Sequence, residues 1–246
     1  MLNLLYTEVL KLKRAKIMWL LPIGGLLPTL LSLIIIINNL KNYNIHWESA
    51  FKNNFVFMTL IMGVALFSLI SGYVFSREYT ENTANTLYTY PVDKSKFIFA
   101  KLMVIFIMIY ITLAINYVSL LVGGMMLIKE PMTGSLLIDT MKSQLLIGIM
   151  FFALSPVSAL LGVIGKNVIP PIVLGISGVI TNIVVVNSKY IFLFPWSIPT
   201  AYIFRENVDN PGLAYINAGI ILTGMFIIFL IGLIGYLKKK DVYAGS

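Results

Sequence analysis

The residues whose types and spacing are best suited to polar chemistry lie in the interval 75–96, between two long apolar stretches. The spacing of Thr83, Leu87 and Tyr90 places apolar and aromatic side chains on roughly one side of a short helix. Pro91 ends that helix, because its ring disfavours helical geometry in the residue before it. The pattern predicts either an amphipathic segment that the membrane presents to a soluble partner, or a solvated connector.

Residues for catalysis or metal binding are scarce in the sequence. The chain has no cysteine, and therefore no thiolate nucleophile or thiolate metal site. Its single histidine, His46, lies beside Trp47 and Glu48, and one histidine without a partner cluster is more often a loop residue than a metal ligand. A glycine-rich phosphate loop ending in Lys-Ser or Lys-Thr is absent. We therefore expect a non-catalytic chain that binds no cofactor or metal itself.

The composition indicates an integral membrane protein. Of the 246 residues, 59% are hydrophobic and 11% are charged. A soluble fold of this composition would expose large apolar patches to water. The apolar stretches are about 20 residues long or more, which suits helices that cross roughly 30 Å of hydrocarbon. The sequence therefore predicts an all-α, polytopic membrane protein.

Six of these stretches are long enough to be transmembrane helices. Before them, Leu5, Val9 and Leu12 recur at helical spacing opposite basic residues, which predicts an N-terminal interfacial helix. Residues 188–212 are apolar and aromatic but interrupted by prolines, which indicates an extracellular re-entrant or interfacial segment. The predicted single transmembrane domain, 1–246, comprises the interfacial helix 1–16, the spans 17–37, 54–75, 101–128, 144–164, 168–187 and 213–237, and the polar region 76–100.

The basic residues give the topology. They are not interleaved with aromatic residues on a soluble surface, so the net charge of +8 does not indicate a nucleic-acid partner. Six spans place both termini on one side, and that side carries Lys11, Lys13, Arg14, Lys16, Arg77, Lys94, Lys96, Lys101, Lys166, Lys238, Lys239 and Lys240. The opposite side carries only Lys41, Lys52, Lys129, Lys142, Lys189 and Arg205. The positive-inside rule therefore places both termini and the region 76–100 in the cytoplasm.

The polar region also resembles a known family. The run Phe-Ser-Arg-Glu-Tyr at 75–79, followed by Glu81, Thr83, Leu87, Pro91-Val92 and Lys101, is similar to the signature of the type-2 ABC exporter permeases. Asn82 departs from this pattern, because the family usually has glycine there. In that family the loop after the second span carries a coupling helix that docks into the ATPase subunit. The resemblance implies that residues 76–100 contain such a cytoplasmic coupling helix.

The resemblance further implies the partners and the function. A permease of this family works with two ABC ATPase subunits, which bind ATP and Mg²⁺, and with a second permease chain that is a copy or a relative. The chain then resembles bacterial cell-membrane permeases that export lantibiotics, bacitracin-type antibiotics, peptide toxins or hydrophobic drugs and so confer immunity. The residues that would couple it to the ATPase are Arg77, Glu78, Glu81, Thr83, Leu87, Tyr90 and Pro91.

The predicted spans lack Asp, Glu, Lys and Arg away from their ends, which argues against a proton- or sodium-coupled carrier. A pathway between them would be apolar with scattered amides and hydroxyls, which suits an amphipathic or lipid-like cargo. The candidate pathway residues are Asn116, Asn182, Asn217, Phe192, Phe194 and Trp196. Each of them also has a structural interpretation: the asparagines could form hydrogen bonds between helices, and the aromatic residues could form a belt at the membrane interface.

Two other functions stay open at the level of the sequence. One is an ATP-independent membrane carrier, or an immunity or sensor protein that binds peptides. The other is an intramembrane enzyme, which would need charged residues or histidines that converge at mid-depth. The sequence offers no such set, so an exporter permease is the leading hypothesis.

Overall fold

The structure is a computed structural model that describes residues 2–13, 15–39, 46–81, 83, 94–188, 190–204 and 211–243. Over these residues the secondary structure is helical, without strands. The elements are α1 (Leu2–Lys13), η1 (Lys16–Trp19), α2 (Leu20–Asn39), α3 (Trp47–Phe57), the π-helical turn η2 (Met58–Met62), α4 (Gly63–Thr80), α6 (Lys94–Leu127), α7 (Gly134–Gly165), α8 (Ile169–Val185), η3 (Pro195–Ser197), α9 (Ile198–Ile203) and α10 (Pro211–Tyr243).

Five helical stretches are long and apolar enough to cross a membrane: Lys16–Asn38, Trp47–Thr80, Lys94–Leu127, Gly134–Gly165 and Gly212–Lys238. They match five of the six predicted spans in order. The remaining prediction, 168–187, corresponds to α8, an apolar helix of 17 residues that is shorter than the other five. The chain is thus an all-helical, multi-pass membrane protein, and the sixth crossing stays a prediction.

Several helices begin earlier in the chain than the sequence indicated. The second long helix begins at Trp47 instead of Asn54, because Trp47, Phe51 and Phe55 bury one face of its first turns. The fourth begins at Gly134 instead of Gln144. The third begins at Lys94, so Lys101 lies inside a helix and does not open it. In each case polar residues at the helix start led us to expect a longer connector.

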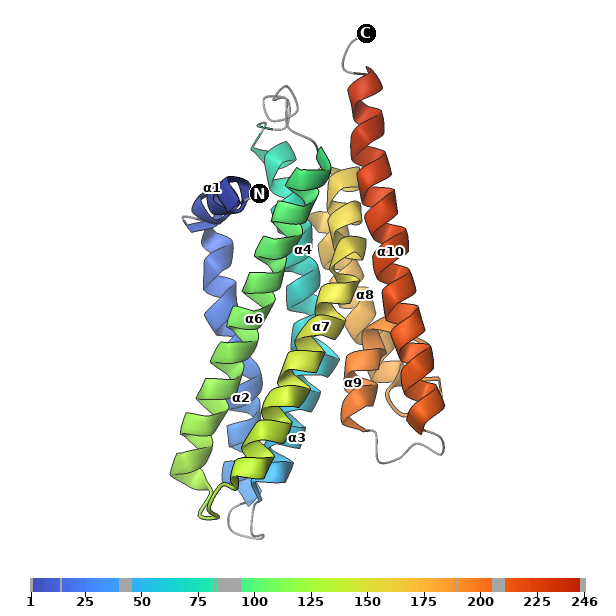
Figure 1. The fold of residues 1–246 in the computed structure, drawn as a ribbon. Helices are drawn as coiled ribbons and strands as arrows, with labels where there is room; N and C mark the ends of the chain where they lie inside the picture. The colour runs from blue at the N-terminus through green and yellow to red at the C-terminus, as the bar shows by residue number, and fades with distance from the viewer. Residues whose placement is uncertain are drawn as a thin grey trace.

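The helices form an elongated bundle in which long helices lie side by side (Figure 1). Helix α4 packs against α7 and α8, α2 packs against α6, and α10 packs against α7. The N-terminal helix α1, the start of α6 and the C-terminal end of α10 lie at one end of the bundle. The short helix α9 lies toward the other end, beside the start of α10. This arrangement agrees with the predicted placement of both termini on one side.

Glycines allow the central helices α4, α7 and α8 to approach closely. A Cβ atom added at Gly162 of α7 would lie 2.7 Å from the backbone oxygen of Gly72 in α4. One added at Gly72 would overlap the ring of Pro171 of α8. Such approach of backbones is the usual way for membrane helices to gain packing contacts. These three helices therefore form the tightly packed centre that leads from the polar region to the opposite end of the bundle.

Candidate functional site

The root of the predicted coupling region is the C-terminal end of α4. Helix α4 ends at Thr80, and the backbone amide of Glu81 still donates to the carbonyl oxygen of Arg77 at 2.9 Å. The Thr83 amide then donates to the carbonyl oxygen of Glu78 at 2.9 Å. These bonds fix how the chain leaves the helix. The predicted coupling residues Leu87, Tyr90 and Pro91 lie outside the described residues, so their roles and the helix they predict stay predictions.

Glu78, expected to face the ATPase, points into the protein instead. It is 5% exposed, and its Oε1 atom lies 3.0 Å from Nζ of Lys101 and 3.5 Å from Nζ of Lys11. Oε2 of Glu8 lies 3.7 Å from the same Lys101 nitrogen. Glu8, Lys11, Glu78 and Lys101 are called the ion-pair cluster below. Its members come from α1, α4 and α6, which are far apart in the sequence.

The ion-pair cluster contains two carboxylates and two ammonium groups, so its formal charges cancel when all four are ionised. Lys101 is 2% exposed and also donates to the carbonyl oxygen of Val74 at 2.6 Å. The rings of Phe75 and Phe97 lie 5.3 and 5.0 Å from its ammonium nitrogen, within the range of a cation–π contact. Cancelled charge and satisfied donors are what make the burial of such groups tolerable.

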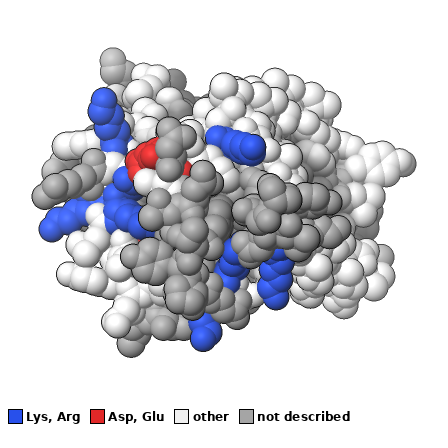
Figure 2. Space-filling view, turned by 90° about the horizontal axis from the view of Figure 1, so that it is seen from above, with Lys and Arg blue, Asp and Glu red and all other residues white. Residues whose placement is uncertain are grey.

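Arg77 and Glu81 form the outer part of this root. Arg77 Nε donates to Glu81 Oε1 at 2.7 Å, and Arg77 also donates to the backbone oxygen of Lys11. The Glu81 side chain is 48% exposed, so it remains accessible to a partner. Figure 2 views this end of the molecule and shows basic side chains at several places around one small acidic patch. The structure thus brings together Arg77, Glu78, Glu81 and Thr83, with Glu81 on the surface.

The face of α1 that packs against the other helices contains Glu8, which is 3% exposed, and Leu12, which is 5% exposed. Val9 is 43% exposed on another face, and the predicted interfacial placement of this helix stays a prediction. The buried face therefore contains a carboxylate, because Lys11 and Lys101 supply its counter-charges. Sequence reasoning missed Glu8 and Lys11. The available signal was a glutamate one residue from the predicted apolar stripe, in a chain with only 10 acidic residues.

Among the candidate pathway residues, Asn116 holds two helices together. It is fully buried, and its Nδ2 atom donates to the carbonyl oxygen of Gly25 at 3.0 Å and to Oγ1 of Thr29 at 3.2 Å. Both acceptors lie on α2, whereas Asn116 lies on α6. The alternative interpretation of this residue, an interhelical hydrogen bond, is confirmed, and a role in a pathway stays a prediction.

Asn182 on α8 is also fully buried. Its Nδ2 atom donates to the backbone oxygens of Thr59 and Leu60, at 3.3 and 3.1 Å, and to Oγ1 of Thr200 at 3.3 Å. Thr59 and Leu60 belong to the π-helical turn η2, and Thr200 belongs to α9. This amide therefore links α8 to both η2 and α9.

The aromatic candidates gather near α9 and the start of α10. Phe194 and Trp196 have ring centroids 5.7 Å apart, and Phe192 packs edge-on to Tyr215 of α10 at 6.0 Å. Asn217 is exposed on α10. These residues and Asn182 lie in one part of the bundle, whereas Asn116 lies between α2 and α6. The six candidates do not line one continuous surface within the described part of this chain.

Comparisons with known proteins agree with this architecture. Residues 4–182 match the model of the ABC-2 family transporter proteins. The chain is also similar to the bacitracin transport permease protein BCRB of Bacillus licheniformis, with 29% identity over 201 residues that cover 81% of this chain and 95% of the relative. The family match covers the long helices from α2 to α7, the root of the coupling region and most of α8. The chain therefore belongs to the ABC-2 family of transporter proteins.

Proposed function

We propose that this permease is the membrane subunit of an ATP-driven exporter in a bacterial cell membrane. Its coupling region receives force from a separate ABC ATPase, of which two copies bind ATP and Mg²⁺. A second permease chain, identical or related, completes the transport pathway between the two membrane subunits. Family membership supports the class of transporter, and the ion-pair cluster supports the route by which force enters the helices.

The ion-pair cluster is the observation that carries the proposal. It lies directly behind the point where the coupling region leaves α4, and it joins that point to α1 and α6. Ion pairs removed from water resist separation, because each charge left alone would be strongly destabilised. A push on the coupling region therefore moves the ends of α4, α6 and α1 together instead of bending a loose connector.

Transport follows from this rigid attachment. When the ATPases close on ATP, they displace the coupling region, and α4 transmits the displacement to α7 and α8, against which it packs. Rigid-body shifts of packed helices of this kind switch a membrane cavity between two accessible sides. The cargo we propose is an amphipathic or antimicrobial peptide or a hydrophobic drug, since the helices offer apolar surface and the named relative transports bacitracin.

A co-purification experiment tests the coupling step. The double variant Glu81→Lys and Leu87→Asp reverses the exposed charge and removes one predicted apolar contact, without changing the buried Glu78. We expect it to lower the affinity for the cognate ABC ATPase by roughly tenfold or more, the equivalent of about 1.4 kcal/mol. Peptide-stimulated ATP hydrolysis in proteoliposomes should fall in parallel.

The matched control is Lys142→Glu, which reverses an exposed charge at the other end of the bundle, where Lys142 pairs with Asp139. It should assemble and hydrolyse ATP as the parent does. The coupling assignment fails if the double variant binds the ATPase and stimulates hydrolysis normally. It also fails if Lys142→Glu is impaired to the same degree, because the effect would then not depend on the coupling region.

A further inference from the structure

We propose that η2 is a hinge in the second membrane helix. Asn182 holds η2 in its π-helical form, and the hinge allows α3 to rotate relative to α4. Helices α3, η2 and α4 together form the continuous stretch Trp47–Thr80. The hinge divides it into α3, which lies away from α1, and α4, which carries the coupling region. The hinge itself is inferred from geometry and does not require the transport proposal.

A π-helical turn contains one residue more than the α-helix needs to cover the same length. Its signature here is the bond from the amide of Gly63 to the carbonyl oxygen of Met58, five residues earlier. The widened turn leaves backbone carbonyl groups poorly paired, which is costly inside a membrane. Such a turn persists only where another group satisfies those oxygens.

Asn182 supplies that group. Its side-chain nitrogen donates to the carbonyl oxygens of Thr59 and Leu60, both within η2. The same nitrogen donates to Thr200 of α9, so the short helix of the outer segment is attached to the hinge as well. The three polar residues Thr59, Asn182 and Thr200 are each fully buried. The amide thus recognises the π-helical form, whose carbonyl groups it satisfies.

A cavity of only about 10 Å³ lies directly beside the hinge, lined by Gly63 and Phe67 of the second helix, Phe151 and Ser155 of α7, and Trp196. These neighbouring side chains must therefore shift when the hinge moves. The Ser155 hydroxyl is buried without a hydrogen-bond partner among the described residues. If the surplus residue moves out of η2, α3 turns by about 100° relative to α4, the angle between successive residues of an α-helix. Such a turn would reposition the apolar face of α3.

If the protein transports as proposed, the hinge converts movement of α4 into movement of α3 and α9. That step rests on the proposed function, whereas the hinge can be tested without an ATPase. The chain has no cysteine, so two introduced cysteines would be its only thiols. Phe51 of α3 and Tyr117 of α6 have ring centroids 5.5 Å apart, and cysteines at these positions report the orientation of α3.

The test uses the double variant Phe51→Cys and Tyr117→Cys in membrane vesicles, and it measures the rate at which a short bifunctional reagent joins the two introduced thiols. Asn182→Leu should lower this rate by roughly tenfold. The buried carbonyl groups of Thr59 and Leu60 then lose their donor, so the π-helical form is no longer more stable than an α-helical one. Deletion of Ile61, an exposed residue of η2, should leave the cross-linking rate unchanged, since it removes the surplus residue. In the deletion background, Asn182→Leu should no longer have an effect.

Two controls sharpen the result. Asn217→Leu makes the same substitution at an exposed position of α10 and should not change the rate. Deletion of Ile111, in the uninterrupted α-helix α6, should prevent correct insertion, because no surplus residue absorbs the change. The hinge is disproved if the Ile61 deletion misfolds as the Ile111 deletion does. It is also disproved if Asn182→Leu leaves the cross-linking rate unchanged, or if Asn182→Leu has the same effect with and without the Ile61 deletion. If the parent protein transports no peptide with its ATPase while the cross-linking results are as expected, the proposed function is wrong and the hinge stands.

Discussion

Lys101 shows how a single buried charge organises the cytoplasmic end that we predict. Its ammonium group contacts Glu78, Glu8 and the carbonyl oxygen of Val74, and its side chain is almost fully buried. From the sequence, we expected Lys101 to begin a span and Glu78 to contact the ATPase. In the structure the two residues neutralise each other, so only Glu81 of the two glutamates remains available on the surface.

Replacement of Lys101 should therefore cost more than replacement of an exposed lysine. Lys101→Met leaves the carboxylates of Glu8 and Glu78 buried together, and we expect it to lower the free energy of unfolding by about 3–5 kcal/mol. Thermal unfolding in detergent measures the effect. The double variant Lys101→Met with Glu78→Leu should recover most of the loss, because the remaining pair, Glu8 and Lys11, is again neutral. If the double variant is less stable than Lys101→Met, the charges do not compensate each other as described.

Among the elements, α4, α7 and α8 depend on glycine for their close packing. Gly162→Ala would place a Cβ atom 2.7 Å from the backbone oxygen of Gly72, and a backbone atom cannot move aside as a flexible side chain can. We expect this substitution to lower the free energy of unfolding by about 1–3 kcal/mol, the usual cost of overpacking. Urea or thermal unfolding in detergent provides the measurement.

The matched control is Gly219→Ala on α10, where an added Cβ atom meets nothing within 4 Å. Alanine favours the helix over glycine by up to about 1 kcal/mol, so this variant should be as stable as the parent or more stable. Equal destabilisation by the two substitutions would show that helix flexibility, and not the contact between α7 and α4, explains the role of Gly162.

Predictions from the sequence succeeded where one local pattern decides the structure. Apolar length identified the five long helices, and prolines after residue 194 indicated short segments in place of a span. They failed where a distant residue changes what a local pattern means. Glu8 is buried because Lys101 reaches it from α6, and η2 forms where Asn182 of α8 bonds to its carbonyl groups. Neither partner is visible within a window of neighbouring residues.

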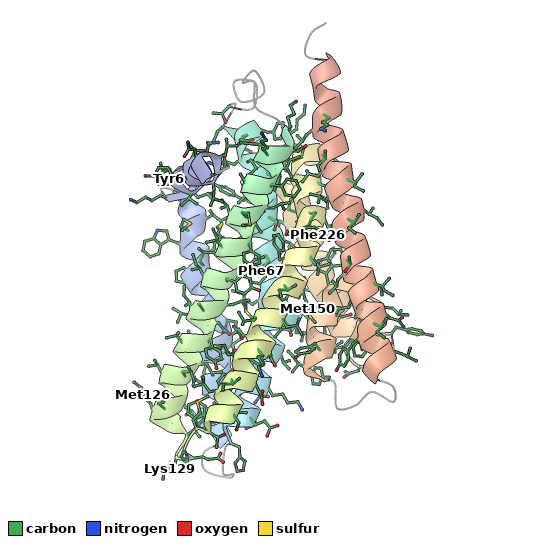
Figure 3. The ribbon with its side chains drawn as sticks, in the orientation of Figure 1. Tyr6, Phe67, Met126, Lys129, Met150 and Phe226 are labelled. Atoms are coloured by element: carbon green, nitrogen blue, oxygen red, sulfur yellow. The ribbon has the colours of Figure 1, made fainter. Side chains whose placement is uncertain are left out.

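At the scale of the whole molecule, the two ends of the bundle differ in chemistry. One end carries α1 with exposed Lys13, and the exposed Lys166 and Lys238 of distant segments. The other end carries the pair between His46 and Glu130, at 2.9 Å, and the connector that contains Lys129. Figure 3 shows Tyr6 near the first end and Met126 and Lys129 near the second, with Phe67 between them. The positive-inside rule therefore predicts that α1 lies in the cytoplasm.

Labelling of single cysteines tests this orientation directly. The natural chain has no cysteine, so Lys13→Cys and Lys129→Cys each introduce the only thiol, at opposite ends of the bundle. We expect a membrane-impermeant maleimide applied to intact cells to label the Lys129→Cys variant and to leave the Lys13→Cys variant unlabelled until the cells are lysed. Ile228→Cys, on the exposed apolar face of α10, is the control for a thiol buried in lipid and should react in neither condition. Labelling of the Lys13→Cys variant in intact cells would place the ion-pair cluster and the coupling region outside, away from ATP, and the proposed exporter mechanism would then be wrong.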